Sequence, residues 1–128
     1  MTAPADRSGV RCRCTCPGAT VWLTGGPAAD RLAAAYALAE RLLAEERRVE
    51  VLDRFDELGT DARRIGLVAE VLARNGVVAV VPCAPETLAA VRARHSASNT
   101  RYVEICVTGR RSPEESVRAA HGRLLGPH

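Results

Sequence analysis

The chain has 128 residues, a formal net charge of +3 and 47% apolar residues, which is typical of a single globular domain. One Trp, two Tyr and one Phe with so modest a charge argue against a dedicated nucleic-acid surface, which would combine clustered cations with stacking rings. All eighteen basic residues are arginines, and this excludes Schiff-base lysines and the lysine that binds phosphate in P-loops. The sequence shows neither a membrane-spanning apolar run nor a signal-peptide core, so we expect a cytoplasmic protein without a membrane partner.

Residues 1–17 are predicted to form a flexible arm ahead of one α/β domain at 18–128. The arm contains Cys12, Cys14 and Cys16, which would point the same way in an extended segment, about 7 Å apart. Such thiols could bind a soft metal, and a thiol or metal-binding module is one alternative function. Metal sites usually show Cys-x-x-Cys spacing, however, and no fourth ligand is evident. An incidental thiol-rich tail without metal is therefore the favoured interpretation.

After the arm, short apolar runs alternate with helical patterns. The first half of the domain predicts a strand at 19–23, a turn, a helix at 28–47, a strand at 49–52 and a helix at 61–74. Residues that recur at helical spacing are predicted to form one buried stripe on each helix. The first stripe consists of Leu32, Ala35, Leu38, Ala39, Leu42 and Leu43, and the second of Ile65, Val68, Ala69 and Leu72.

The second half continues the alternation. It predicts a strand at 77–81, a helix from about 85 to 95, a strand at 102–107 and a final helix opened by Ser112 as N-cap. Cys83 and Cys106 are interpreted as core residues. Four strand–helix units favour a parallel sheet with helices on both faces, whose ligand sites lie at the carboxyl ends of the strands.

Several stretches between about residues 18 and 107 resemble adenylylsulfate (APS) kinases. They are Val21–Gly25 with Pro27, Val49–Asp53, Arg63–Glu70, Leu72–Val77, Pro82, Ala84-Pro85, Ala90–Arg92, Arg94-His95 and Tyr102–Glu104. The resemblance implies a P-loop-kinase-like sheet of about four strands, truncated after Val107, where the family's lid is absent. It also implies descent from enzymes that transfer the γ-phosphate of ATP to the 3′-hydroxyl of adenylylsulfate with Mg²⁺.

The phosphate loop departs from the family pattern at three successive positions. Asp30-Arg31-Leu32 stands where the pattern requires Gly-Lys-Ser/Thr. Asp30 brings a carboxylate to the place of a phosphate, Leu32 cannot bind Mg²⁺, and the planar fork of Arg31 does not replace a compact ammonium. Tight triphosphate binding is not expected, so we predict no cofactor, with weak ATP and Mg²⁺ binding left open.

The remaining site residues are carried over from the same resemblance. Asp53 survives from an acidic motif as a degenerate catalytic remnant, and with Asp56 and Glu57 it is a weaker candidate for a divalent cation. Arg63 and Arg64 correspond to positions that include a substrate-binding arginine, although a solvated helix face explains them equally well. Gly25, Gly26 and Arg31 are candidates for a residual anion site, against the simpler interpretation of Gly25-Gly26 as a tight turn.

Together these features predict a pseudoenzyme, an APS-kinase-like protein that binds a partner enzyme or an anionic ligand in sulfur or specialised metabolism. The alternative from the enzyme class is a divergent kinase with residual phosphotransfer through Arg31 and Asp53. Because kinases of this family are dimers, we expect a homodimer or a heterodimer with an intact paralogue.

Overall fold

Residues 18–54, 61–83, 88–107 and 113–125 are described by the computed structural model. They form a four-stranded, wholly parallel sheet in the order β2-β3-β1-β4. The strands are β1 (Ala19–Thr24), β2 (Val49–Val51), β3 (Val78–Pro82) and β4 (Tyr102–Cys106). The predicted parallel α/β architecture is therefore confirmed, whereas the predicted arm at 1–17 lies outside the described residues.

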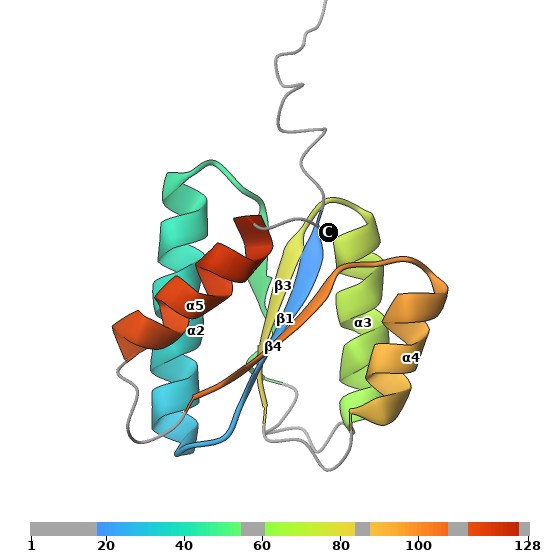
Figure 1. The fold of residues 1–128 in the computed structure, drawn as a ribbon, viewed down its shortest axis with the longest axis horizontal. Coiled ribbons are helices and arrows are strands. Elements are labelled where there is room, and N and C mark those ends of the chain that lie inside the picture. The colour runs from blue at the N-terminus through green and yellow to red at the C-terminus, as the bar shows by residue number, and fades with distance from the viewer. Residues whose placement is uncertain (1–17, 55–60, 84–87, 108–112, 126–128) are drawn as a thin grey trace, which may run out of the picture.

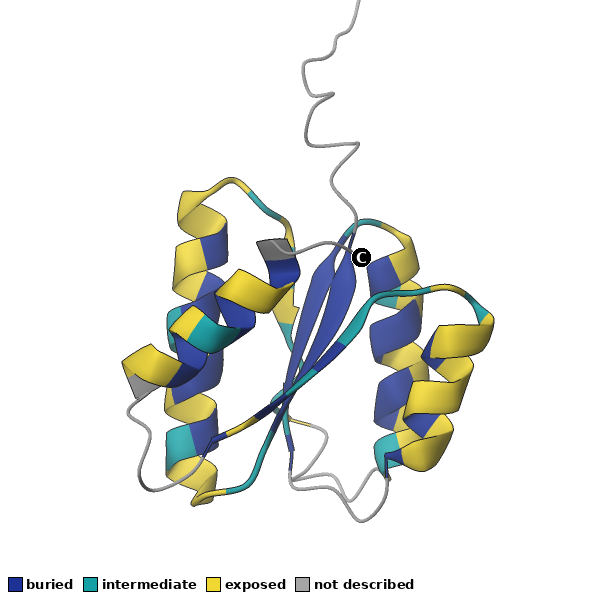
Figure 2. Cartoon of the chain, viewed as in Figure 1, coloured by how far each residue is buried: buried dark blue, intermediate teal, exposed yellow. Residues whose placement is uncertain are grey.

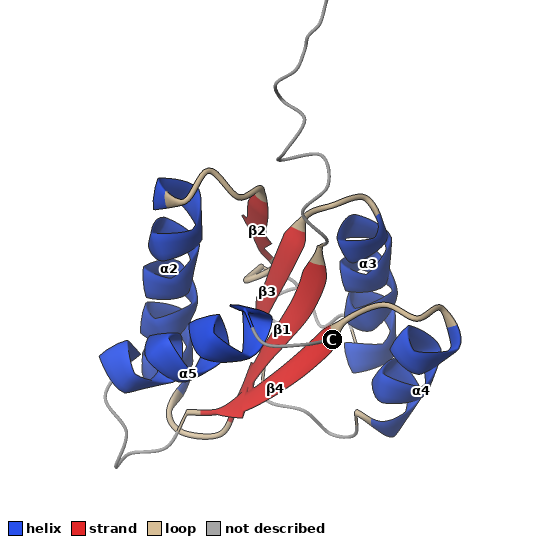
Figure 3. Ribbon diagram, turned by 45° about the horizontal axis from the view of Figure 1, so that its top comes forward, coloured by secondary structure: helices blue, strands red, loops and turns tan. Residues whose placement is uncertain are grey.

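Helices cover both faces of the sheet. On one face lie α2 (Ala28–Ala44) and α5 (Pro113–Leu125), and on the other lie α3 (Ala62–Arg74) and α4 (Ala89–Ala97) (Figures 1 and 3). Successive side chains of β1 point to opposite faces of the sheet and so pack in both layers of the core. Val21 and Leu23 pack in the cluster with α2 and α5, while Trp22 packs with α3. The Trp22 indole Nε1–H donates to the carbonyl oxygen of Cys83 at 3.1 Å, so the large ring is buried without a lost hydrogen bond.

The two predicted helix stripes are only partly buried. Ala35, Leu38 and Leu42 of α2 are fully covered, but Leu32 is 40% exposed and Leu43 is 58% exposed. The same correction applies to α3, where Val68 is 39% exposed. Figure 2 shows buried residues on the sheet-facing side of the helices and exposed ones outside. Helical spacing therefore overestimated the width of the buried stripe on both helices.

The ends of some elements differ from prediction for local reasons. Helix α2 ends at Ala44 rather than at residue 47, because Glu46 takes a left-handed φ of 63° and Arg47 N–H bonds back to the Leu42 carbonyl. Helix α4 begins at Ala89, and not at about residue 85 as predicted. Residues 84–87 and the predicted N-cap Ser112 lie outside the described residues. No helix within the described segments has the length and apolar character that a bilayer span requires.

Candidate functional site

The turn between β1 and α2 is built on two glycines with left-handed backbones. Gly25 has φ 73° and Gly26 has φ 65°, which other residues adopt at a cost. A Cβ on Gly25 would also lie 2.8 Å from Cys106 Sγ and 3.2 Å from the Val107 carbonyl oxygen. Glycine at position 25 is thus required by the fold alone. The same contact places Cys106 at this turn, exposed at the end of β4, so its prediction as a core residue is wrong, whereas Cys83 is buried as expected.

Arg31 turns back onto this loop from the first turn of α2. Its Nη1 donates to the carbonyl oxygens of Gly26 at 2.7 Å and Gly25 at 3.2 Å. The side chain is 7% exposed, and its buried Nε has no hydrogen-bond partner. The guanidinium group of Arg31 therefore binds the loop's own carbonyls through Nη1, while its Nε–H has no acceptor.

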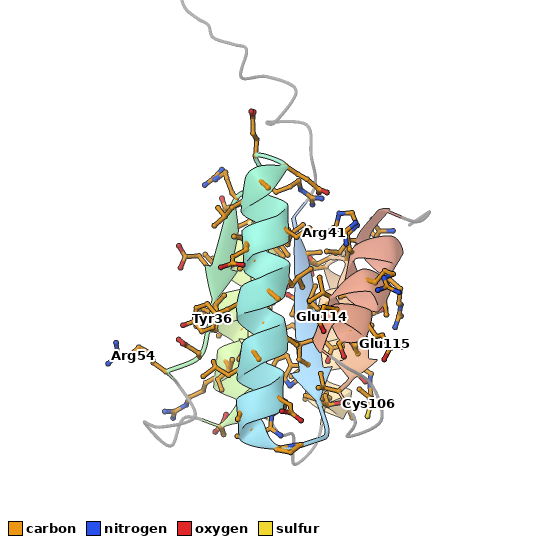
Figure 4. The ribbon with its side chains drawn as sticks, turned by 90° about the vertical axis from the view of Figure 1, so that its left-hand side faces the viewer. Tyr36, Arg41, Arg54, Cys106, Glu114 and Glu115 are labelled. Atoms are coloured by element: carbon orange, nitrogen blue, oxygen red, sulfur yellow. The ribbon has the colours of Figure 1, made fainter. Side chains whose placement is uncertain are left out.

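Asp53, just beyond β2, is engaged by a residue that the sequence did not single out. The hydroxyl of Tyr36, on α2, donates to its Oδ2. This hydrogen bond to the carboxylate is the main reason why the pKa of Tyr36 is raised above 10. Figure 4 shows Tyr36 on the side of α2 that faces β2, opposite to α5, with Arg54 nearby. Asp56 and Glu57, the other proposed cation ligands, lie outside the described residues, which hold no metal-ligand cluster.

A separate pocket of about 530 Å³ lies between the first turns of α3 and α4. Gly66 allows this close packing, since a Cβ there would lie 2.8 Å from a methyl carbon of Val91. Because α3 and α4 both follow strands of a parallel sheet, the pocket lies at the carboxyl end of the sheet, where a ligand site is expected. Its lining consists of Asp61, Arg63, Arg64, Gly66, Leu67, Ala90, Val91 and Arg94.

The cations of this pocket are not equivalent. The guanidinium groups of Arg63 and Arg64 are exposed and are not bonded to any described residue, whereas Arg94 pairs with the buried Glu70. Burial alone would raise the pKa of Glu70, but hydrogen bonds from Ser98 and Arg94 hold it below its ordinary value. Asp61, the one acid among the described lining residues, serves as the N-cap of α3 and accepts the Arg64 backbone N–H at 2.9 Å. The pocket therefore presents two positive charges that no described residue pairs with.

The predicted ligand-binding residues thus fall into two groups. Gly25 and Gly26 form the loop onto which Arg31 of α2 turns back, and Arg63 and Arg64 line the pocket on the other face of the sheet. Sequence reasoning missed Arg94, because its position in the pocket depends on how α3 and α4 pack. It missed Tyr36 as well, since nothing in the pattern of α2 signals a partner for Asp53.

No protein-family model matches the chain. The adenylyl-sulfate kinase of Picosynechococcus sp. is 36% identical over 78 residues, which cover 50% of this chain and 44% of that protein. A probable adenylyl-sulfate kinase of Synechocystis sp. is 35% identical over 78 residues, with the same coverage of 50% and 44%. The expected resemblance to adenylyl-sulfate kinases is confirmed over half of the chain.

Solved structures of APS kinases share the fold of this chain. A mutant of the Mycobacterium tuberculosis APS kinase CysC superposes with a TM-score of 0.71 and 21% identity over 86% of this chain and 99% of that one. The same enzyme in complex with AMPPNP and APS gives 0.61 at 25% identity, over 71% and 62% of the two chains. A hexameric APS kinase from Thiobacillus denitrificans gives 0.62 at 26% identity, over 84% and 29%.

The match to the curated relatives is partial. The chain spans less than half of the length of the two adenylyl-sulfate kinases that it matches. The fold is therefore shared with APS kinases, while activity and substrates do not follow from the comparison. A function for this chain has to be inferred from the residues of the loop and of the pocket.

Proposed function

We propose that this adenylyl-sulfate kinase-like protein binds an anionic ligand between α3 and α4 and does not transfer phosphate. The proposal rests on the hydrogen-bond partners of three arginines. Arg31 donates to the glycine carbonyls of the loop, whereas the guanidinium groups of Arg63 and Arg64 line the pocket without a bond to any described residue. Two planar guanidinium groups at a concave site suit a sulfate or phosphate group, because each presents paired N–H donors to the oxygens.

The loop itself supports binding without catalysis. A P-loop requires backbone N–H groups and a free cation directed at the phosphates, with a hydroxyl that binds Mg²⁺. Here Asp30 adds a carboxylate to the first turn of α2 and Leu32 replaces the hydroxyl. Asp53, the acid that the family resemblance assigns to catalysis, accepts the Tyr36 hydroxyl instead. None of these residues supplies what the γ-phosphate needs.

The natural candidate ligand is an adenylyl sulfate-like nucleotide, given what the curated relatives are named for. We propose that the protein works in sulfur or specialised metabolism, as a cytoplasmic partner of an intact paralogue or of another enzyme of the pathway. Such a protein would hold or deliver the nucleotide without consuming it. This role requires affinity at the pocket and tolerates a disabled loop.

The test is a calorimetric titration of the full chain with adenylyl sulfate, and with ATP in the presence and absence of Mg²⁺. We expect binding of adenylyl sulfate, weakened about tenfold by Arg63→Gln or Arg64→Gln, because each removes a charge-assisted contact. Arg74→Gln is the matched control, since Arg74 lies on the last turn of the same helix, outside the pocket. Equal affinities for the three variants would exclude the pocket.

A turnover assay decides between binding and residual catalysis. The chain, incubated with ATP, Mg²⁺ and adenylyl sulfate, should give no more phosphorylated product than a blank without protein. Steady turnover that Arg31→Ala abolishes would overturn the pseudoenzyme proposal and favour a divergent kinase. The family fold would stand in either case.

A further inference from the structure

Two arginines of α4, Arg92 and Arg94, each pair with a glutamate, but they use their guanidinium groups differently. Arg92 donates from Nε at 2.6 Å and from Nη2 at 3.0 Å to the two carboxylate oxygens of Glu104. Arg94 donates to Glu70 from Nε alone. Both arginine side chains are 56% exposed, so the difference does not come from their burial. Within the described segments, the terminal nitrogens of Arg94 have no acceptor.

Arg94 is the cation that α4 contributes to the pocket. It lines the pocket together with Ala90, one turn earlier, whereas Arg92 is not part of the lining. Arg94 lies in the last turn of α4, but helical side chains lean toward the N-terminus of their helix, which is the end that borders the pocket. Arg63 and Arg64 line the pocket from α3. Guanidinium groups therefore lie on both walls of the pocket.

Glu70 is an unusual partner for an exposed arginine. Its side chain is 2% exposed, and it lies on α3 one turn after Gly66, on the side that meets α4. Burying a carboxylate costs free energy unless hydrogen bonds and an opposite charge compensate for it. The carboxylate accepts hydrogen bonds from Ser98 and from Arg94. A buried, fixed charge thus holds one end of a guanidinium group whose other end borders the pocket.

This arrangement orients Arg94 without using all of its donors. A guanidinium group is planar and carries five N–H donors in a rigid fork. Because Glu70 accepts only the Nε–H, the four terminal N–H donors of Arg94 stay available to a ligand. The negative charge of Glu70 also offsets the repulsion that Arg94 meets from Arg63 and Arg64 on the opposite wall.

We infer that Arg94 binds the anion of this pocket through its terminal nitrogens, and that Glu70 is the positioning residue that holds Arg94 in place for it. The inference rests on the proposed function, and it adds a binding residue from α4 to the two arginines of α3. The ligand class is a sulfate or phosphate group whose oxygens are bound from both helices, since paired N–H donors match such oxygens. Glu70 itself does not line the pocket and acts through Arg94.

The first test is a calorimetric titration of full-chain variants with adenylyl sulfate. Arg94→Lys keeps a charge that can pair with Glu70 but removes the fork, so the dissociation constant should rise about tenfold. Arg92→Lys is the matched control, because Arg92 is on the same helix, equally exposed and paired with a glutamate, but outside the pocket. It should change the dissociation constant less than about twofold. Equal dissociation constants for the two variants would overturn the inference, even if Arg63→Gln still weakens binding and so supports the proposed function.

A second titration separates positioning from support of the fold. Glu70→Ala should weaken binding by the folded protein about as much as Arg94→Lys does, and Glu70→Gln should weaken it less, because an amide oxygen still accepts the Nε–H. The double variant Glu70→Ala/Arg94→Lys should bind no more weakly than Arg94→Lys, since Glu70 acts through Arg94. Unchanged affinity in folded Glu70→Ala, or additive losses in the double variant, would refute the positioning role.

A third measurement uses the wild-type chain and does not depend on whether any variant folds. Proton–nitrogen correlation spectra record the Nε–H signal of Arg94, which should exchange slowly with water because its acceptor is buried. Inorganic sulfate and adenylyl sulfate should each shift this signal without removing it. A shift with sulfate alone would support the inference and contradict the nucleotide of the proposed function. Binding of adenylyl sulfate that leaves the signal unchanged would overturn the inference and leave the proposed function standing.

Discussion

Nη1 of Arg31 lies 2.7 Å from the carbonyl oxygen of Gly26, inside the loop where the family resemblance expects a phosphate. The side chain starts one turn into α2 and returns to the residues that precede the helix. It thereby joins the end of β1 to the start of α2, a connection that a bound phosphate would otherwise make. The positive charge that the sequence keeps at this position therefore has a structural role in the loop.

Replacing Arg31 by Ala should therefore destabilise the fold. The substitution removes two hydrogen bonds from a buried charged donor and leaves two carbonyls without their partner, which costs about 1–3 kcal/mol. Arg41→Ala, on the exposed part of the same helix, should cost less than about 1 kcal/mol through the helix dipole alone. Urea unfolding measures both. Equal losses would mean that the loop contacts contribute nothing.

Much of the fold was predictable because strand and helix patterns are local. The run of valines and one alanine at residues 77–81 lies almost entirely in the central strand β3, and Asn75-Gly76 ends α3, with Gly76 at φ 84°. The width of the buried stripe on each helix, by contrast, depends on which distant segments pack against the helix. Leu32 and Leu43 belong to the helical period of α2, but β2 is a short edge strand, and no described segment of the chain covers that flank.

The candidate site was predictable to a smaller extent. The resemblance identified Arg63 and Arg64, which the structure brings to one pocket, and identified Arg31 in its loop. What each arginine binds depends on packing between distant segments. The direction of the Arg31 fork and the pairing of Tyr36 with Asp53 arise only when α2 lies across the sheet, so residue types alone could not reveal them.

The pairing of Glu70 with Arg94 predicts a loss of stability in acid. The pKa of Glu70 in the folded protein is held below its ordinary value of 4.5. The contribution of the ionised Glu70 to folding stability is therefore complete above about pH 4.5, and it is lost as the pH falls through the lower pKa of the folded state. Glu70→Gln should cost about 1–3 kcal/mol at pH 7, and the difference from the wild type should shrink below pH 4.5. Glu40→Gln, at an exposed position of α2, is the control.

Thermal unfolding at a series of pH values measures the effect of Glu70. A difference between wild type and Glu70→Gln that stays constant from neutral to acidic pH would contradict the depressed pKa. A large effect of Glu40→Gln would point to net charge in place of the specific pair.

The cysteine arm gives a prediction about metal content. If residues 1–16 are an incidental tail, deleting them should leave both thermal stability and zinc or copper content unchanged. A soft-metal site would instead give near-stoichiometric metal in the purified chain, lost on Cys14→Ser, and stability that rises with metal concentration. We expect the first result, measured by elemental analysis and thermal melts. Stoichiometric metal that Cys14→Ser removes would assign the function to the arm.

Two helical glycines differ in what surrounds them, and this predicts opposite effects of the same substitution. A Cβ on Gly122, in α5, meets nothing within 4 Å, so Gly122→Ala should stabilise the protein by about 0.5–1 kcal/mol through helix propensity. A Cβ on Gly66 would lie 2.8 Å from a Val91 methyl carbon. Overpacking costs about 1–3 kcal/mol, which outweighs the propensity gain, so Gly66→Ala should destabilise.

A double-mutant cycle identifies Val91 as the cause. Val91→Ala removes the methyl groups that the new Cβ would meet, so Gly66→Ala should cost less in the Val91→Ala background than in the wild type. Because the same contact sets the spacing of α3 and α4, Gly66→Ala should also weaken ligand binding at the pocket, while Gly122→Ala should not. If the effects of the two substitutions were additive, the cost of Gly66→Ala would not come from its contact with Val91. The spacing of α3 and α4 would then not depend on that contact.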